Sequence, residues 1–515
     1  MERAIARAAR RPLLPAICLY LLAVALLYPA FGYRVDPDAT AYFSLAHKWA
    51  QGDWLQAITG HWPPLLIWMI ALGLKAGLNV FMAIAASSAL AGCLLLWSVH
   101  KLAVKPTHGP VLPWALLGTV SFYAIFYTFA MTPDLLLAAL LTCYLALCAE
   151  PRPPAGTLWI IGMVAGLAYL AKPVALYFVL FHYALSCLVD NWREHQPWPA
   201  VFRRIGIVTV MMLLVAAPWV GCLWVKYHRF TFSTGGDFFF RALAPAFHDA
   251  GIVNVGLAAP PNSTAYNYWE DPGRLNLPPW SPLESRESFR YFLGYFRANI
   301  VQFALLMEIF SIAAFPILGY ALFRWRPGRS DRGVTVLACA ALLLSGAYCV
   351  FVPAPRYVFV IALWLLLLAV GYFPESNRSK SQLCFSFLPV MLYSLAVGFG
   401  AGQPARDVGR KLPSVLAPNS RVASLSAREF MRSLNVSYWA GLRYYGATAP
   451  GSADDVRREL ARYDIQYVLV WANEIPAPHL LDGMRKLESP VPALRIYAIA
   501  EDRIGSVRNL ERERN

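Results

Sequence analysis

Charge is scarce in this sequence. Only 15% of its 515 residues are charged, against 58% that are hydrophobic, and one soluble core cannot bury so much apolar surface. An ordinary soluble enzyme is therefore excluded, and a polytopic membrane protein is predicted. Cysteine is absent from the polar C-terminal segment, since all nine cysteines lie in apolar runs. We therefore expect neither a disulfide framework nor a thiolate metal site.

The net charge of +15 does not indicate nucleic acid, because much of the excess lies at the chain ends and in short loops between apolar runs. Lysine and arginine in such loops mark the cytoplasmic side of a membrane. The apolar run after the basic N-terminus is too long for a cleaved signal peptide, so we expect a retained first span. The basic loops carry Lys101/Lys105, Arg152, Arg193/Arg203/Arg204, Arg324/Arg326/Arg329/Arg332 and Arg378/Lys380.

The apolar runs predict the number of spans, because one span needs roughly 20 residues. Residues 62–77 are slightly short and open with two prolines, which favours the outer interface. Residues 158–189 are too long for one span and are interrupted by Lys172-Pro173, which favours two helices with a hinge there. These two choices give about eleven spans, with every basic loop on the cytoplasmic side. If residues 62–77 instead crossed the membrane and residues 158–189 formed one span, Lys101 would lie outside. The other runs are 13–33, 80–100, 112–130, 133–149, 205–225, 298–323, 334–352, 357–373 and 383–400.

This topology divides the chain at residue 400. Residues 1–400 form a transmembrane domain with outer loops at 34–61 and 226–297, and the second loop is expected to be an ordered cover. Residues 401–515 alternate β-rich runs with helices, which predicts a small periplasmic α/β domain without a Gly-rich phosphate loop or a repeat. The expected location is a bacterial inner membrane. Strands are expected at 421–425, 465–471 and 494–499, and helices at 427–434 and 453–463.

Ionisable residues near the apolar runs gather at the predicted outer ends, whereas the membrane midplane holds Glu308 as its main charge. Transporters usually place their ion and substrate groups near the midplane, so the distribution favours a site at the outer surface. A carboxylate there can take a proton from an acceptor hydroxyl, and cations can neutralise a phosphate leaving group. A polyprenyl-phosphate sugar is the matching substrate. The residues are Asp36, Asp38, His61, Asp134, Lys172 and Arg356.

Each of these residues also has an ordinary interpretation. The two carboxylates beside Pro37 could solvate a helix end, and Asp134 could be a first-turn acid stabilised by the helix dipole. Lys172 could extend its ammonium toward water. His61 could be a satisfied interface residue, and Arg356 could simply end a span. Both readings therefore stay open on the residues alone.

Residues 33–54, YRVDPDATAYFSLAHKWAQGDW, resemble the first outer loop of class C glycosyltransferases, specifically the bacterial relatives of protein O-mannosyltransferases and lipid A aminoarabinose transferases. Shorter resemblances follow in the family's order and cover most of the membrane region. They are His61-Trp62-Pro63-Pro64-Leu65 to an H-P-P-L element, Thr132-Pro133-Asp134 to an R-P-D turn, Ala171-Lys172-Pro173 to a T-K-P element, and Arg356-Tyr357 to an R-Y opening of a late span.

The resemblance implies that Asp38 is the catalytic base, because it matches the aspartate of a P-D-E-x-x-Y pattern that Tyr42 completes. Ala39 stands where the family has a second acid, which leaves Asp36 as a substitute carboxylate. Tyr42, Asp36 and His61 are expected to contact the substrate. Asp134 would be a second catalytic acid that positions the acceptor.

The remaining implied roles concern the donor and a metal ion. Lys172 and Arg356 are expected to bind the donor phosphate, with Arg241 or Arg229 of the long loop as further candidates. Metal dependence differs within the family, so a divalent ion is an open expectation. Its ligands would come from Asp36, Asp38, His61 and Asp134.

Two functional hypotheses follow. The first is an inverting glycosyltransferase that moves one sugar from a polyprenyl-phosphate donor to a lipid, glycan or protein acceptor in the periplasm, with Asp38 as base. It predicts that Asp38, Asp134 and Lys172 meet in one outer cavity open to lipid. The alternative is a non-enzymatic transporter or binding subunit for lipid-linked glycans, which would depend on midplane residues such as Glu308. Neither involves nucleic acid.

Overall fold

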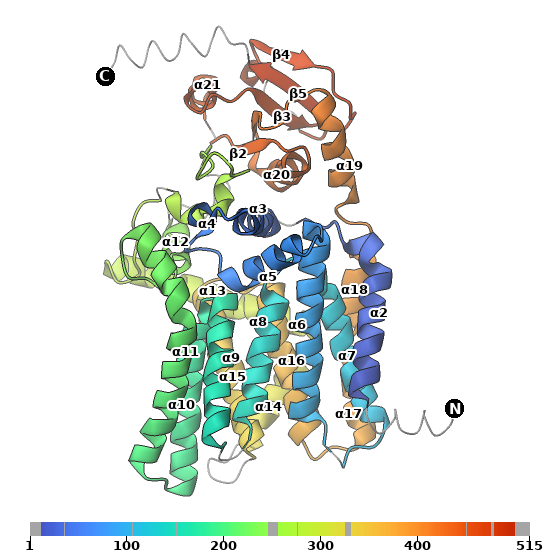
Figure 1. Cartoon of the computed structure of the whole chain (residues 1–515), viewed down its shortest axis with the longest axis vertical. Coiled ribbons are helices and arrows are strands. Elements are labelled where there is room, and N and C mark those ends of the chain that lie inside the picture. Colours follow the sequence, from blue (N-terminus) through green and yellow to red (C-terminus); the bar gives the residue numbers. More distant parts are fainter. Residues whose placement is uncertain are drawn as a thin grey trace. The chain divides into compact units, whose positions relative to one another are not determined.

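The computed structural model describes residues 12–35, 37–105, 107–150, 153–245, 256–275, 277–324, 331–449, 451–474 and 478–499. The chain divides into two compact units, each continuous in space but not in sequence (Figure 1). The helical unit comprises Met1–Gly32, Pro63–Phe232 and Ser285–Phe399. The mixed unit comprises Tyr33–Trp62, Ser233–Glu284 and Gly400–Asn515.

The helical unit is a bundle of apolar helices. In the described residues, nine helical stretches are long and apolar enough to cross a membrane, and shorter apolar helices lie among them. Its helices are α2 (Leu13–Phe31), α5 (Pro64–Lys75), α6 (Val80–Ala103), α7 (Val111–Thr128), α8 (Asp134–Cys148), α9 (Ala155–Ala171), α10 (Val174–Glu194), α11 (Trp198–Tyr227), α13 (Arg286–Phe310), α14 (Ala314–Arg324), α15 (Arg332–Val350), α16 (Pro355–Tyr372), α17 (Asn377–Ser386) and α18 (Pro389–Gly398).

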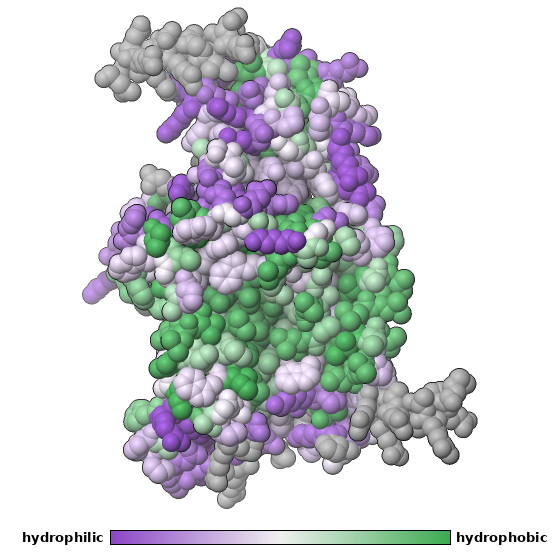
Figure 2. All heavy atoms as spheres, in the orientation of Figure 1, coloured by the Kyte–Doolittle hydropathy of each residue, from purple (hydrophilic) through white to green (hydrophobic). Residues whose placement is uncertain are grey.

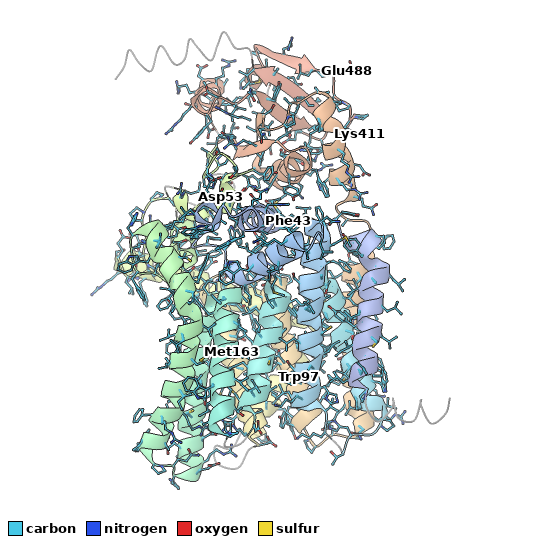
Figure 3. All side chains as sticks on the ribbon, viewed as in Figure 1. Phe43, Asp53, Trp97, Met163, Lys411 and Glu488 are labelled. Atoms are coloured by element: carbon cyan, nitrogen blue, oxygen red, sulfur yellow. The ribbon has the colours of Figure 1, made fainter. Side chains whose placement is uncertain are left out.

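Large apolar side chains cover the outside of this bundle. Figure 2 shows a hydrophobic belt over the helices, with hydrophilic residues toward their ends. Trp97 on α6 and Met163 on α9 belong to the belt and are 38% and 41% exposed (Figure 3). A soluble protein rarely exposes so continuous an apolar surface. The predicted fold class, a polytopic α-helical membrane protein with a small α/β domain, is confirmed.

Prolines decide where several helices break. The predicted hinge is present, because α9 ends at Ala171, Lys172 is extended, and α10 begins after Pro173. The single span predicted over 298–323 is wrong, since Ser311 is extended and separates α13 from α14. The run 383–400 is likewise divided, because α18 begins anew at Pro389.

A buried ionic group ties four helices together at one end of the bundle. Asp190, near the end of α10, accepts hydrogen bonds from Arg332 at the start of α15 and, at 3.4 Å, from Arg204 on α11. The Arg332 Nε also donates to the carbonyl of Cys148 on α8 at 2.7 Å. Such a charge-assisted network fixes these helix ends relative to one another.

The mixed unit is built around a five-stranded sheet. Its strand order is β2-β1-β3-β5-β4, with β1 parallel to β2 and β3, and β5 antiparallel to β3 and β4. The predicted strands and helices of this region are present, whereas β2 and β4 were not predicted. The elements are α3 (Pro37–Gln51), α4 (Trp54–Ala57), α12 (Gly235–Ala242), α19 (Gln403–Lys411), β1 (Arg421–Ser424), α20 (Phe430–Trp439), β2 (Arg443–Ala447), α21 (Ala453–Arg462), β3 (Tyr467–Trp471), β4 (Met484–Leu487) and β5 (Leu494–Ile499), with short 3-10 turns at Tyr268–Glu270, Pro272–Arg274, Leu412–Ser414, Ala427–Glu429 and Pro478–Leu480.

Both faces of the sheet are covered, because alternate residues of a strand point to opposite sides. Val422 and Leu469 pack with Leu434 of α20 on one face. Ala423 and Val468 pack with residues of α21 on the other. The strands therefore read as short continuous apolar runs, which made β1 and β3 predictable.

Candidate functional site

Three helix ends meet at one end of the helical unit. α8 begins at Asp134 directly after Pro133, and α9 ends just before Lys172. α16 begins at Pro355, so Arg356 and Tyr357 lie in its first turn. We call Asp134, Lys172, Arg356 and Tyr357 the helix-end cluster. Three of its four members were predicted from the sequence to face the same side of the membrane.

The helix-end cluster is organised around the Tyr357 ring. The Lys172 ammonium lies 3.8 Å from the ring centroid and 2.6 Å from Asp134 Oδ1. The Arg356 guanidinium lies 5.2 Å from the same centroid, and its Nη2 donates to the Tyr357 hydroxyl at 3.2 Å. Tyr348 stacks on Tyr357 with centroids 5.1 Å apart. Two cations are thus held beside one aromatic ring, an arrangement that strengthens as water is excluded.

Amide side chains of α13 hold the turn that precedes Arg356. Asn299 Nδ2 donates to the carbonyls of Cys349 and Phe351 at 2.9 and 3.0 Å. Gln302 donates to the Pro353 carbonyl at 3.2 Å. These bonds satisfy carbonyls that the end of α15 leaves without helical partners, and they fix where Arg356 emerges.

The helix-end cluster is polar but mostly shielded. The Asp134 side chain is 3% exposed, and Lys172 keeps 20% of its side chain accessible. Asp134 neutralises one of the two cations, so the described cluster carries one net positive charge. A phosphate placed here would meet an ammonium and a guanidinium, the groups that bind phosphate through charge-assisted hydrogen bonds.

A second cluster lies in the mixed unit, around Asp38 in the first turn of α3. Trp269 Nε1 donates to Asp38 Oδ1 at 3.0 Å, and Trp62 Nε1 donates to the Trp269 carbonyl at 2.7 Å. Asp38 itself is half-buried. We call Asp38, His61, Trp62, Trp269 and Asp271 the loop cluster.

His61 is a buried polar group of the loop cluster. It is 8% exposed, and its ring lies 4.5 Å from that of Trp62 and 5.1 Å from that of Phe238. Burial lowers the pKa of His61 to about 4, although the charges of Asp38 and Asp271 oppose the shift. The imidazole is therefore neutral at pH 7. Its Nδ1 is buried and has no hydrogen-bond partner among the described residues.

A buried ion pair anchors α3 to the long loop. Lys48 Nζ lies 2.6 Å from Glu270 Oε2, and the two side chains are 4% and 1% exposed. Burial raises the pKa of Glu270, while Lys48 acts against that rise. Glu270 also accepts from the Tyr266 backbone N–H at 2.8 Å. This pair places Trp269, its neighbour in sequence, where it reaches Asp38.

The sequence did not single out Trp269, Asp271, Lys48 or Glu270. Each acts across more than 200 residues of chain, which no local pattern reveals. Asp271 is 3% exposed and accepts a hydrogen bond from the Thr59 hydroxyl at 3.4 Å. The available signal was the acidic pair Glu270-Asp271 beside Pro272-Gly273, unusual in an otherwise aromatic loop.

The other predicted site residues have varied placements. Tyr42 is buried and packs edge-on against Trp62, with ring centroids 5.2 Å apart. Arg241 pairs with Asp237 at 3.1 Å and donates to the Leu277 carbonyl at 3.2 Å, so it holds α12 to the loop. Asp36 lies outside the described residues. The predicted meeting of Asp38 with Asp134 and Lys172 involves both units and stays a prediction.

The predicted metal ligands do not form a ligand set in the part of the chain that the structure describes. No three His, Cys, Asp or Glu side chains gather there as a metal site would need. Asp134 is already paired with Lys172. The divalent ion stays an expectation of the resemblance.

The fold and the helix-end cluster together define a polytopic membrane protein with the class C glycosyltransferase fold. The chain superposes on the crystal structure of ArnT from Cupriavidus metallidurans bound to undecaprenyl phosphate, with a TM-score of 0.54 and 16% identity over 94% of this chain and 98% of that chain. The apo structure of the same protein gives a TM-score of 0.52 and 14% identity over the same shares. No family model and no curated sequence matches this chain.

Proposed function

We propose that the protein is a membrane glycosyltransferase that moves one monosaccharide from a polyprenyl-phosphate donor to an acceptor in the cell envelope. The observation that carries the proposal is the helix-end cluster on this fold, because its ammonium and guanidinium suit a lipid-linked phosphate at a membrane surface. ArnT, the similar structure, holds undecaprenyl phosphate. A sugar attached to such a phosphate is the donor that this chemistry fits.

The proposed reaction takes Asp38 as the base and Lys172 and Arg356 as the groups that bind the phosphate. The acceptor hydroxyl attacks the anomeric carbon, and the Asp38 carboxylate takes its proton. The bond between the anomeric carbon and the phosphate oxygen breaks, and its electron pair leaves with the polyprenyl phosphate. Lys172 and Arg356 stabilise the charge that collects on the phosphate. One direct displacement inverts the configuration at the anomeric carbon.

Asp38 and its neighbours have distinct tasks in this proposal. Asp38 sits at a helix N-terminus, where the dipole favours a carboxylate, and Trp269 fixes one of its oxygens. Asp134 orients Lys172 and helps to position the acceptor. His61, which is neutral and buried, excludes water from this side of the cluster and offers one ring nitrogen for a hydrogen bond.

The basic residues support an inner-membrane location with the helix-end cluster in the periplasm. Lys101 ends α6, Arg193 ends α10 and Arg378 begins α17, all at the bundle end opposite the helix-end cluster. Under the positive-inside rule that end is cytoplasmic. The acceptor, whether lipid, glycan or protein, then lies on the periplasmic side.

Replacing Asp38 by Asn tests the mechanism. With donor supplied to purified protein, Asp38→Asn should lower kcat about 10²- to 10⁴-fold, the usual range for a lost general base. The donor KM should stay near that of the wild type. Lys172→Gln should instead raise the donor KM, because it removes a phosphate contact. Asp407→Asn on exposed α19 is the matched control; turnover of Asp38→Asn equal to that control removes the mechanism.

The transporter hypothesis has less support from the side chains. Its main midplane candidate, Glu308, is exposed on α13 and does not face the inside of the bundle. A transport path would need that charge turned inward. Glu308→Gln is therefore expected to leave glycosyl transfer unchanged.

A further inference from the structure

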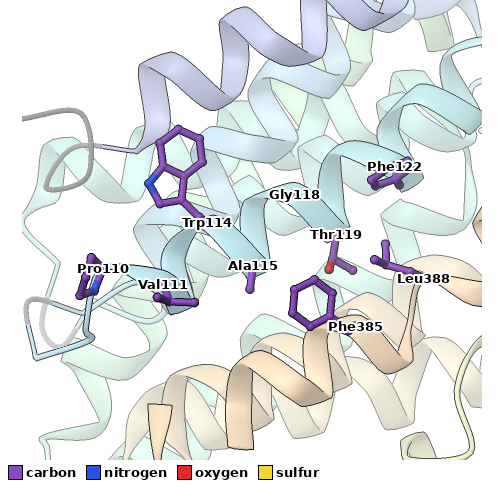
Figure 4. Close-up of a pocket in the computed structure, with 9 residues that line it drawn as sticks. All are labelled: Pro110, Val111, Trp114, Ala115, Gly118, Thr119, Phe122, Phe385 and Leu388. Carbon is purple, nitrogen blue, oxygen red and sulfur yellow. The ribbon is translucent and has the colours of Figure 1, made fainter. Parts of the chain in front are cut away.

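An apolar groove opens on the outside of the helical unit, away from the helix-end cluster. It has a volume of about 470 Å³ and lies between α7 on one side and α17 and α18 on the other (Figure 4). The face of α7 from Val111 to Phe122 forms one wall, and Phe385 and Leu388 form the other. The hydroxyl of Thr119, a polar group in this lining, donates to the Cys384 carbonyl at 3.2 Å. Nothing in this lining suits a polar ligand.

The dimensions of the groove fit one hydrocarbon chain. From Val111 to Phe122 the groove follows eleven helical steps, or roughly 16 Å. This is close to half of the roughly 30 Å hydrocarbon core, the depth of one leaflet. At Gly118 an added Cβ would meet no atom within 4 Å, so the floor is open where a chain would lie.

A cationic group lies near the Pro110 end of the groove, because Lys380 acts electrostatically on His108, two residues before Pro110. Lys380, in the first turn of α17, is only 7% exposed. Among the described residues no side chain forms an ion pair or hydrogen bond with its ammonium. The carboxylate that acts on it, Glu375, is exposed and lies beyond ion-pair distance. Lys105 and His108, on the loop before α7, add to the positive field.

Positive charge gathers at this end of the groove. Lys105 lies over the Tyr372 ring at 4.2 Å, and burial together with Lys380 and Lys105 lowers the pKa of His108. Lys380 and Lys105 both lie close enough to His108 to act on it electrostatically, and positive groups gathered in this way repel one another. An anion seated beside Lys380 and Lys105 would relieve this repulsion. The groove that begins at Pro110 supplies the apolar half of the same ligand.

We propose that this groove binds an anionic membrane phospholipid, with its phosphate beside Lys380 and Lys105 and one acyl chain along α7. The site is separate from the donor site. α7 spans 18 residues, or roughly 27 Å, and its far end leads into α8 and the helix-end cluster. The bound lipid therefore belongs to the leaflet opposite the donor phosphate, and it holds α17 and α18 against α7.

Native mass spectrometry of the purified full chain tests the proposal, with phosphatidylglycerol and phosphatidylcholine as probes. Wild-type protein should retain phosphatidylglycerol in preference to phosphatidylcholine. Lys380→Gln should weaken phosphatidylglycerol binding at least fivefold and leave phosphatidylcholine unchanged. Gly118→Leu should weaken both, because it fills the groove without meeting other atoms.

Two further variants make the result decisive. Lys101→Gln removes an exposed positive charge at the same end of the bundle and should bind like wild type. Lys105→Gln, on a loop, repeats the charge test should Lys380→Gln not fold. Equal binding of the two lipids by wild type, or equal effects of Lys380→Gln and Lys101→Gln, would overturn the proposal.

Discussion

At the scale of single residues, the loop cluster shows how one side chain sets the orientation of another. Asp38 presents its carboxylate at the start of α3, but the helix alone does not fix its rotation. The indole N–H of Trp269 binds one oxygen at 3.0 Å, and Trp62 in turn holds the Trp269 carbonyl. Trp269 is therefore a positioning residue for the proposed base.

Trp269→Phe removes this N–H and keeps an aromatic ring. Because a hydrogen bond to a charged group contributes about 1.5 to 3 kcal/mol, kcat should fall roughly 10- to 100-fold with little change in KM. Trp62→Phe, which removes an indole N–H that binds a carbonyl and not the carboxylate, is the control. An equal fall in kcat for both variants would reduce Trp269 to packing.

Individual site residues could be predicted from the sequence where a chemically reactive side chain stands at a helix end. Asp134, Lys172 and Arg356 each stand beside a proline that starts or stops a helix, so the sequence shows both the residue and its depth. Trp269 and Lys48 carry no such signal. Their partners lie 231 and 222 residues away, and only the fold brings them together.

At the scale of elements, prolines and buried ion pairs determine the connections. The break between α13 and α14 was missed because the run 298–323 is apolar at most positions. Pro316 was the available signal, since a proline there cannot bond to the carbonyl of Ile312 and clashes with it. By contrast, Pro29 and Pro218 lie inside α2 and α11. A proline therefore indicates a break without requiring one.

The Lys48–Glu270 pair should be essential for attaching the long loop to α3. Lys48→Met leaves the Glu270 carboxylate buried without its cation, which should lower the free energy of unfolding by about 3 to 5 kcal/mol. Lys48→Met combined with Glu270→Leu should recover most of that loss. Thermal unfolding of the four proteins in a double-mutant cycle measures the coupling. Additive effects of the two changes would contradict the assigned role.

At the scale of the whole molecule, the alternation of charge along the chain predicts its orientation. The basic helix ends lie at one end of the bundle, and the Asp190 group adds two buried arginines there. The sequence therefore predicted the class of fold, and the side of the membrane on which each loop lies stays a prediction. It did not predict β2 and β4, because their short runs mix polar and apolar residues.

Alkaline phosphatase fusions measure this orientation, because the enzyme folds only after export. A fusion after Arg229, beyond α11, should be active, and one after Arg193, at the end of α10, should be inactive. The single crossing by α11 separates the two points. Reversed activities would place the helix-end cluster in the cytoplasm and exclude a periplasmic acceptor.

The pairing of Lys172 with Asp134 has a consequence for how a lipid enters. With the two charges 2.6 Å apart, Lys172 presents a paired charge and not a free ammonium to an arriving lipid. An arriving phosphate would compete with a carboxylate that is tethered and cannot diffuse away. Selectivity among lipids would then depend on displacing Asp134 from Lys172. An uncharged lipid gains no interaction by separating the pair, whereas a doubly ionised phosphate headgroup binds Lys172 more strongly than the single carboxylate does.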